Sequence, residues 1–275
     1  MSLFDRFRHP VLALALGGAV ATAGGCAPAI STQQEVQLGR QNAAEINRQL
    51  PIVRDAAVNQ YINQLGRSIA RVADPRGIPY TFYVVNSNVV NAFAVPGGHI
   101  YVNRGLIERA DNMSELAGVL AHEVAHVAER HGIEQWQRAQ NANLGLSLLY
   151  GVLLGRSPGA VERVGVQAAG GAVFASYGRD AEREADLRGV DYMVRAGYNP
   201  QGMVRFFNEL LSERKRNPSR LEQWFSTHPL TEERIQNTSR AVEAIPAATR
   251  ARLATDTRAY QSFRARVRSL PAARQ

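Results

Sequence analysis

The sequence predicts an α+β fold that is dominated by helices and contains a small sheet of three or four strands. Apolar residues recur at three- and four-residue spacing over long stretches, which is the period of an amphipathic helix. β-Branched and aromatic residues gather in one short central stretch, 80–102, and a Pro-Gly-Gly turn divides it. The length of 275 residues suffices for one good-sized domain or two small ones.

Composition and charge favour a globular protein and argue against a nucleic-acid-binding protein. A hydrophobic fraction of 45% is ordinary for a globular protein with a core. The net charge of +8 is almost entirely arginine, because Lys215 is the only lysine. The sequence has no long basic run and no alternation of basic and aromatic residues, so we predict no nucleic-acid partner. The excess charge is interpreted as a solvated, arginine-rich surface.

The first residues have the pattern of a secretory signal. Arg6 and Arg8 precede an apolar stretch over 11–23, which is too short to span a bilayer comfortably as a permanent helix. Two processing routes stay open. Cleavage at the small-x-small run Ala-Thr-Ala (21–23) would release a soluble protein, whereas Ala-Gly-Gly-Cys (23–26) resembles a bacterial lipobox.

Cys26 favours the lipobox. It is the only cysteine, so no intrachain disulfide is possible, and it stands where a lipobox places its lipidated residue. We therefore expect residues 1–25 to be a lipoprotein-type signal peptide and Cys26 to carry a membrane anchor. Ala27 follows the cysteine, and the absence of Asp there resembles lipoproteins sorted to the outer membrane. The expected location is the periplasmic side of a bacterial cell envelope.

Two helices are predicted before the sheet. Ser31 or Thr32 can cap a helix that Pro51 ends. A second amphipathic helix is expected over about 55–72, and the run Asp-Pro-Arg-Gly at 74–77 stops it.

The sheet is predicted from three short runs, at 80–85, 91–95 and 99–102, with Pro-Gly-Gly turning the chain between the last two. After Gly105 the sequence is typical of helices to its end. The apolar stretch Leu144–Leu154 is about half the length of a membrane span, so it is interpreted as a buried helix, with a membrane-facing helix as the alternative.

The predicted organisation has four parts. After the signal, residues 26–50 are expected to form an N-terminal lead segment that contains a helix, and residues 51–245 the main domain. Residues 246–275 are expected to be an arginine-rich C-terminal helix, running from about Ala247 to Val267 with a solvated face.

The chemistry is concentrated in His-Glu-Val-Ala-His at 122–126. It lies within a helix predicted from Met113 or Ser114 to about Arg130. Residues four apart share one helix face, so both imidazoles can reach one metal ion. Glu123 projects beside that ion, where its carboxylate can accept the proton of an attacking water.

A zinc site of this kind needs a third protein ligand. His131 is nine residues after His122, which places it on the opposite side of the predicted helix, so we interpret it as a packing histidine. The better candidate is Glu182, with Asp186 one helical turn further on to accept the free N–H of a ligating histidine. Glu184 is expected to point elsewhere, as a surface or salt-bridge residue.

These motifs together resemble the HtpX and CAAX-prenyl-protease family of zinc metallopeptidases, metallopeptidase family 48. The resemblance rests on His-Glu-x-x-His, on the Glu-x-Glu-Ala-Asp run at 182–186, and on Ser-Thr-His-Pro (226–229) followed by Glu-Arg-Ile (233–235). The chain is similar to the periplasmic BepA- and LoiP-like branch, in a short form without helical repeats.

The resemblance implies a zincin-like (gluzincin) peptidase domain that holds one Zn²⁺. It implies that His122, His126 and Glu182 bind the metal, that Glu123 is the base, and that Asp186 orients a ligand. His228 and Arg234 would face the metal; they could stabilise an oxyanion, or the histidine could occupy the open zinc position and keep the enzyme latent.

The implied activity is that of a zinc metalloendopeptidase acting on misfolded or unassembled cell-envelope proteins, as quality control of the outer membrane. The alternative is a zinc-latent chaperone or assembly factor for outer-membrane proteins. The expected partners are such substrates, the membrane through Cys26, and outer-membrane assembly machinery.

Overall fold

The structure is a computed structural model that describes residues 30–138, 140, 177–216 and 218–272. The predicted signal peptide 1–25, the lipidation site Cys26 and the apolar stretch Leu144–Leu154 lie outside the described residues. Within the described ranges, no helix is long and apolar enough to cross a membrane.

A three-stranded sheet lies at the centre of the fold, as predicted. Its strands are β1 (Thr81–Val85), β2 (Ala92–Val95) and β3 (His99–Asn103), in the order β1-β3-β2. β1 pairs in parallel with β3, and β2 pairs antiparallel with it through a tight turn. Gly97 and Gly98 in that turn have φ of 81° and 90°, a conformation that glycine adopts without strain.

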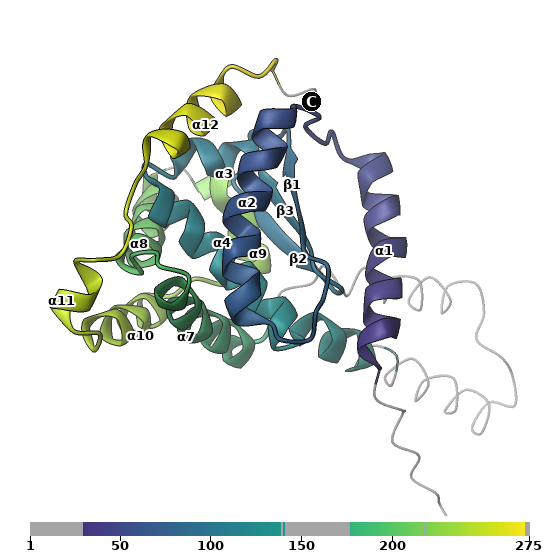
Figure 1. Cartoon of the computed structure of the whole chain (residues 1–275), viewed down its shortest axis with the longest axis horizontal. Helices are drawn as coiled ribbons and strands as arrows, with labels where there is room; N and C mark the ends of the chain where they lie inside the picture. Colours follow the sequence, from purple (N-terminus) through teal and green to yellow (C-terminus); the bar gives the residue numbers. More distant parts are fainter. Residues whose placement is uncertain (1–29, 139, 141–176, 217, 273–275) are drawn as a thin grey trace, which may run out of the picture.

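Helices cover both faces of the sheet (Figure 1). α1 (Thr32–Gln49) lies on one face, and α2 (Ala56–Ala73) and α4 (Met113–Ala128) lie on the other. Ser31 caps α1 with a full capping box, which confirms the predicted start of that helix. α1 runs very close to the β2–β3 turn, since a Cβ added to Gly39 would lie 2.0 Å from the carbonyl oxygen of Pro96.

α4 is the central helix of the core. Every residue from Met113 to Val127 is buried. The helix that carries Met203 packs closely against α4. A Cβ added to Gly118 would lie only 2.8 Å from Cα of Met203. Further helices of the described residues include α3 (Arg104–Arg109), α7 (Arg179–Arg195), α8 (Gln201–Arg216), α9 (Pro218–Thr227), α10 (Glu232–Glu243), α11 (Ala247–Arg250) and α12 (Arg258–Arg268).

The prediction of one C-terminal helix over 247–267 is wrong. The chain leaves α11 after Arg250 and pairs its backbone with other segments, through Ala254 N–H to Gly197 O and Ser114 N–H to Thr255 O. Thr257 then caps α12 by accepting from the backbone N–H of Tyr260. These long-range backbone bonds cannot be seen in the local helical pattern.

The expectation of a solvated face on this helix holds only in part. Tyr260, Phe263 and Val267 of α12 are buried in the core, and Phe263 stacks on Tyr61 of α2 with ring centroids 4.5 Å apart. The arginines between them include Arg264, which donates to the carbonyl oxygen of Glu108 on α3. The C-terminal helix is therefore part of the domain that it covers.

Candidate metal centre

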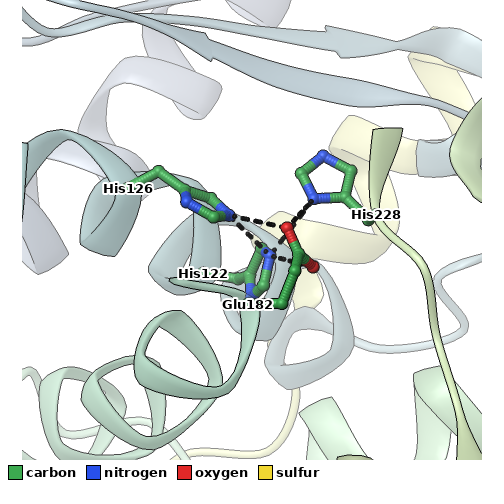
Figure 2. Close-up of side chains that lie close together, drawn as sticks. All are labelled: His122, His126, Glu182 and His228. Carbon is green, nitrogen blue, oxygen red and sulfur yellow. Dashed lines mark hydrogen bonds and ion pairs between the residues drawn. The ribbon is translucent and has the colours of Figure 1, made fainter. Parts of the chain in front are cut away.

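Four side chains from three parts of the chain converge at one buried point (Figure 2). His122 and His126 come from α4, one turn apart, as the helix period predicts. Glu182 comes from the first turn of α7, and His228 follows α9 directly. All four are at most 1% exposed.

Their donor atoms are spaced like ligands of one ion. The Nε2 atoms of His122 and His126 are 3.0 Å apart, and Oε1 of Glu182 lies 3.4 Å from Nε2 of His126. Nδ1 of His228 lies 3.1 Å from the same Glu182 oxygen and 3.4 Å from Nε2 of His122. A tetrahedral ion with bonds of about 2.0–2.1 Å separates its donor atoms by about 3.3–3.4 Å.

Orphaned polar atoms beside this cluster also fit a bound ion and its water. Both carboxylate oxygens of Glu123 and Nε2 of His228 are buried without a hydrogen-bond partner among the described residues. Unpaired buried polar groups are costly, so a ligand, an ion or water is expected to meet them. Nε2 of His228 lies 3.4 Å from Oε1 of Glu123, which places the predicted base at the edge of the cluster.

Asp186 and Arg234 contact members of the four-donor cluster. Oδ1 of Asp186 lies 3.0 Å from Nδ1 of His122, close to that nitrogen but without hydrogen-bond alignment. Arg234 donates to both oxygens of Asp186, and its Nη1 lies 2.6 Å from Oε2 of Glu182. Nη1 also donates to the carbonyl oxygen of Pro229, so the guanidinium faces these two acids and the loop after His228.

The comparisons agree with this geometry. The sequence profile of Peptidase family M48 matches residues 56–242. The chain belongs to this family. M48 members are metal-dependent peptidases, and the four-donor cluster lies within the matched residues.

Curated relatives within M48 cover part of the chain. It is 32% identical over 225 residues to the beta-barrel assembly-enhancing protease of Escherichia coli (strain K12), a match that covers 75% of this chain and 43% of that protein. It is 31% identical over 183 residues to the metalloprotease YcaL of the same organism, covering 64% of the chain and 69% of YcaL. The mitochondrial metalloendopeptidase OMA1 of Saccharomyces cerevisiae is 30% identical over 169 residues, a match that covers 60% of this chain and 47% of OMA1. The chain thus spans less than half the length of the first of these relatives.

His131 contacts the site without joining the M48 donor cluster. The prediction that it is not part of the metal-binding set agrees with the geometry, because the cluster consists of His122, His126, Glu182 and His228. Yet its Nδ1 lies 2.9 Å from Nδ1 of His126, and its Nε2 lies 3.5 Å from Oε2 of Glu184. The sequence interpretation of His131 as a packing residue missed this contact.

Tyr177 is a further residue that the sequence analysis did not single out. Its ring stacks on the imidazole of His126, with centroids 3.9 Å apart and an interplanar angle of 13°. The only local signal is its position directly before Gly178, which caps the helix that carries Glu182. An aromatic residue at such a position has no motif that marks it.

The electrostatics of the cluster keep a proton on His228 when no metal is bound. Burial lowers the pKa of His228, but the carboxylates of Glu182 and Glu123 outweigh it and raise the pKa to about 9. Burial also raises the pKa of Glu182, yet His228 and the other two histidines hold that pKa well below its usual range. For Glu123 burial dominates and the pKa is raised.

Proposed function

We propose that the chain is a zinc-dependent metalloendopeptidase, with one Zn²⁺ bound by His122, His126 and Glu182. The observation that carries the proposal is the convergence of these three donors with spacings of 3.0–3.6 Å in a buried site. Two imidazoles and a carboxylate are the ligand set of many catalytic zinc sites, and tetrahedral spacing favours zinc over larger, oxygen-seeking ions.

Glu123 is the proposed base. Lewis acidity, which activates water for attack on a peptide carbonyl, is the chemistry that zinc supplies when bound. The carboxylate of Glu123 accepts the proton of the attacking water and passes it to the leaving amine. Burial raises the pKa of Glu123 above its ordinary value, which makes its carboxylate a stronger base.

Asp186 and Arg234 are proposed as positioning residues. Asp186 is proposed to take the Nδ1–H of His122, whose Nδ1 lies 3.0 Å from Oδ1 of Asp186, when Nε2 of that ring binds the metal. The guanidinium of Arg234 is engaged by Asp186, Glu182 and a backbone carbonyl, an arrangement that supports orientation of the ligands better than contact with an oxyanion. We therefore propose this role in place of the oxyanion contact that the family resemblance implies.

An extended peptide is the proposed form of the substrate. β2 is an edge strand of the described sheet, and its residues Ala94 and Val95 lie near His126 and Tyr177. A peptide that pairs with such an edge gains main-chain hydrogen bonds whatever its side chains are. Broad specificity for unfolded segments follows from that mode of binding.

The proposed setting is the bacterial cell envelope. The beta-barrel assembly-enhancing proteases and the signal pattern of residues 1–25 support it. We propose that residues 51–245 are the zinc metallopeptidase domain, that residues 26–50 lead into it from a lipid anchor on Cys26, and that the anchor holds it to the outer membrane. Misfolded or unassembled envelope proteins are then the substrates, and outer-membrane assembly machinery is a further partner.

A second candidate function is a latent zinc site in a chaperone or assembly factor. It is supported by the position of His228, whose Nδ1 lies 3.1 Å from Oε1 of Glu182 and 3.4 Å from Nε2 of His122 and is thus a candidate for the fourth ligand. A site closed in this way has no open position for water.

Zinc content and casein hydrolysis test both candidates, in the wild-type chain and in the variants Glu123→Gln and His228→Ala. The proposed peptidase predicts one zinc in all three and no hydrolysis by Glu123→Gln. If the wild type is inactive but His228→Ala is active, the site is a latent peptidase. One zinc without activity in any of the three favours the chaperone, and absence of zinc from the wild type contradicts the proposed function.

A further inference from the structure

A three-residue hydrogen-bonded chain runs outward from the second histidine of α4. Nδ1 of His126 lies 2.9 Å from Nδ1 of His131, and Nε2 of His131 lies 3.5 Å from Oε2 of Glu184. His126 and His131 are both buried, whereas the side chain of Glu184 is about half exposed. The chain therefore links the donor cluster to a carboxylate at the surface.

The two histidines of α4 are supported in different ways. Nδ1 of His122 meets a carboxylate directly, at 3.0 Å from Oδ1 of Asp186. His126 has no such direct carboxylate at its Nδ1 among the described residues; an imidazole stands between it and Glu184. Outer partners of this kind fix the orientation and tautomer of a ligating imidazole and are a large part of a site's metal affinity.

Ligation of a metal by Nε2 of His126 would fix the direction of the hydrogen bonds between His126, His131 and Glu184. Nε2 of His126 points into the donor cluster, 3.0 Å from Nε2 of His122, so the ring hydrogen of a ligating His126 must be on Nδ1. Nδ1 of His131 then accepts that hydrogen, and the hydrogen of His131 is on Nε2, facing Glu184. Each nitrogen of both rings thus has a defined role.

The local backbone explains how His131 reaches His126. α4 ends at Ala128, and Arg130 has φ of 62°, so the helical path breaks before His131. The polypeptide forms a new helix over 131–138, and its first residue, His131, contacts His126. Arg188, one helical turn after Glu184, forms ion pairs with Glu184 at 3.7 Å and with Glu129 at 3.1 Å. These ion pairs help to position the carboxylate of Glu184.

We propose that His131 and Glu184 form an outer relay that orients His126 and thereby raises the affinity of the site for zinc. This inference rests on the proposed function, since it takes His126 as a zinc ligand. His131 itself faces Nδ1 of His126, the side of that ring turned away from the cluster, so it is a positioning residue and Glu184 acts through it.

The test is a competition between the full chain and a chromophoric zinc chelator. His131→Phe keeps an aromatic ring but removes the acceptor, and we expect it to weaken zinc affinity about 10–100-fold. His131→Asn keeps an oxygen near the position of Nδ1 and should recover most of that loss. Glu184→Gln should weaken binding less than His131→Phe does, because an amide oxygen still accepts from Nε2–H.

Coupling between the two residues separates a relay from a general structural effect. In the relay, the double variant His131→Phe/Glu184→Gln binds zinc no more weakly than His131→Phe alone, because Glu184 acts only through the ring. Asp191→Asn is the matched control on α7, since Asp191 is exposed and pairs only with Arg195 in the described structure. A shift in the absorption bands of the cobalt-substituted His131→Phe chain, absent in the control, is the spectroscopic signature expected.

The outcomes are distinct for the two proposals. A wild-type chain that binds no zinc overturns the proposed function and this inference together. A wild-type chain that binds zinc, with His131→Phe within twofold of its affinity, overturns the inference alone. Additive losses in the double variant, or losses matched by a fall in the unfolding free energy of the metal-free variants, also overturn it.

Discussion

Arg234 on α10 donates hydrogen bonds of 2.7 Å to both carboxylate oxygens of Asp186 on α7. This pair joins the two helices beside the four-donor cluster, because Asp186 contacts His122 and Arg234 contacts Glu182. The pair is almost fully buried. Fixed charges in such a place orient the ligands and also make the site sensitive to the loss of either partner.

We predict that Arg234→Gln lowers the free energy of unfolding by about 3–5 kcal/mol, because it leaves the carboxylates of Asp186 and Glu182 buried without their cation. Urea denaturation of the metal-free chain measures this. Arg240→Gln is the matched control on the same helix, since Arg240 is exposed and its loss should change stability by less than about 0.5 kcal/mol. Equal effects of the two substitutions would contradict the positioning role of Arg234.

The stability of the metal-free chain should depend on pH through His228. The pKa of His228 is raised to about 9, above the value of 6.5 that an unperturbed histidine has. A raised folded-state pKa gives stability that is fully present below pH 6.5 and is lost as the pH rises through 9, and the loss amounts to about 3 kcal/mol. Thermal unfolding of the metal-free chain between pH 6 and pH 9.5 measures it, and His228→Ala should remove most of the pH dependence in that window.

Zinc affinity should change with pH in the opposite direction. If His228 is a zinc ligand, its proton must leave when the metal binds, so the apparent affinity should rise about tenfold per pH unit below pH 9. Chelator competition at several pH values measures the slope. A slope that is the same in the wild type and in His228→Ala would show that His228 loses no proton on binding.

The helix period accounts for most of the candidate site that could be predicted from sequence. His122 and His126 lie one turn apart on α4, and Glu182 and Asp186 one turn apart on α7, as their spacing requires. The same reasoning failed for His131, because it extended the helix of α4 to Arg130. The helix ends at Ala128 and the positive φ of Arg130 redirects the chain, so angular position on a continuous helix no longer applies.

The sheet and the C-terminal residues show the same limit in the fold. The three strands were predicted to within one or two residues, since β-rich runs and the Pro-Gly-Gly turn are local signals. The division between α11 and α12 was not, because it depends on backbone bonds from Ala254 and Thr255 to segments more than fifty residues away. Local pattern carries no information about such partners.

We expect the buried carboxylate of Glu35 to stabilise the packing of α1 against the rest of the domain. Glu35 is fully buried and lies 3.1 Å from Nη1 of Arg76 and 3.0 Å from Nε of Arg130, next to the end of α4. We predict that Glu35→Gln lowers the unfolding free energy by about 1–3 kcal/mol, less than for a fully buried pair because both arginines are partly exposed. Limited proteolysis should also cut α1 faster. Glu45→Gln, at an exposed position of the same helix, is the control and should change neither quantity.

Close packing of α8 on the start of α4 should tolerate no side chain at Gly202. A Cβ there would lie 2.4 Å from the carbonyl carbon of Ser114. Gly202→Ala is therefore expected to cost about 1–3 kcal/mol of unfolding free energy, measured by urea denaturation. Gly178→Ala is the control, because among the described residues nothing lies within 4 Å of a Cβ added there, and the loss of a favourable cap is offset by the lower entropy of the unfolded chain. A larger effect at Gly178 than at Gly202 would contradict this packing.

Calorimetric titration of zinc into the metal-free chain tests the central claim most directly, with His122→Ala and His131→Phe measured beside the wild type. We predict one tight site per wild-type chain, no tight site in His122→Ala, and a weakened site that is still present in His131→Phe. Tight binding that survives His122→Ala, or a wild-type chain that binds no zinc, would contradict the assignment of the buried cluster as the metal centre.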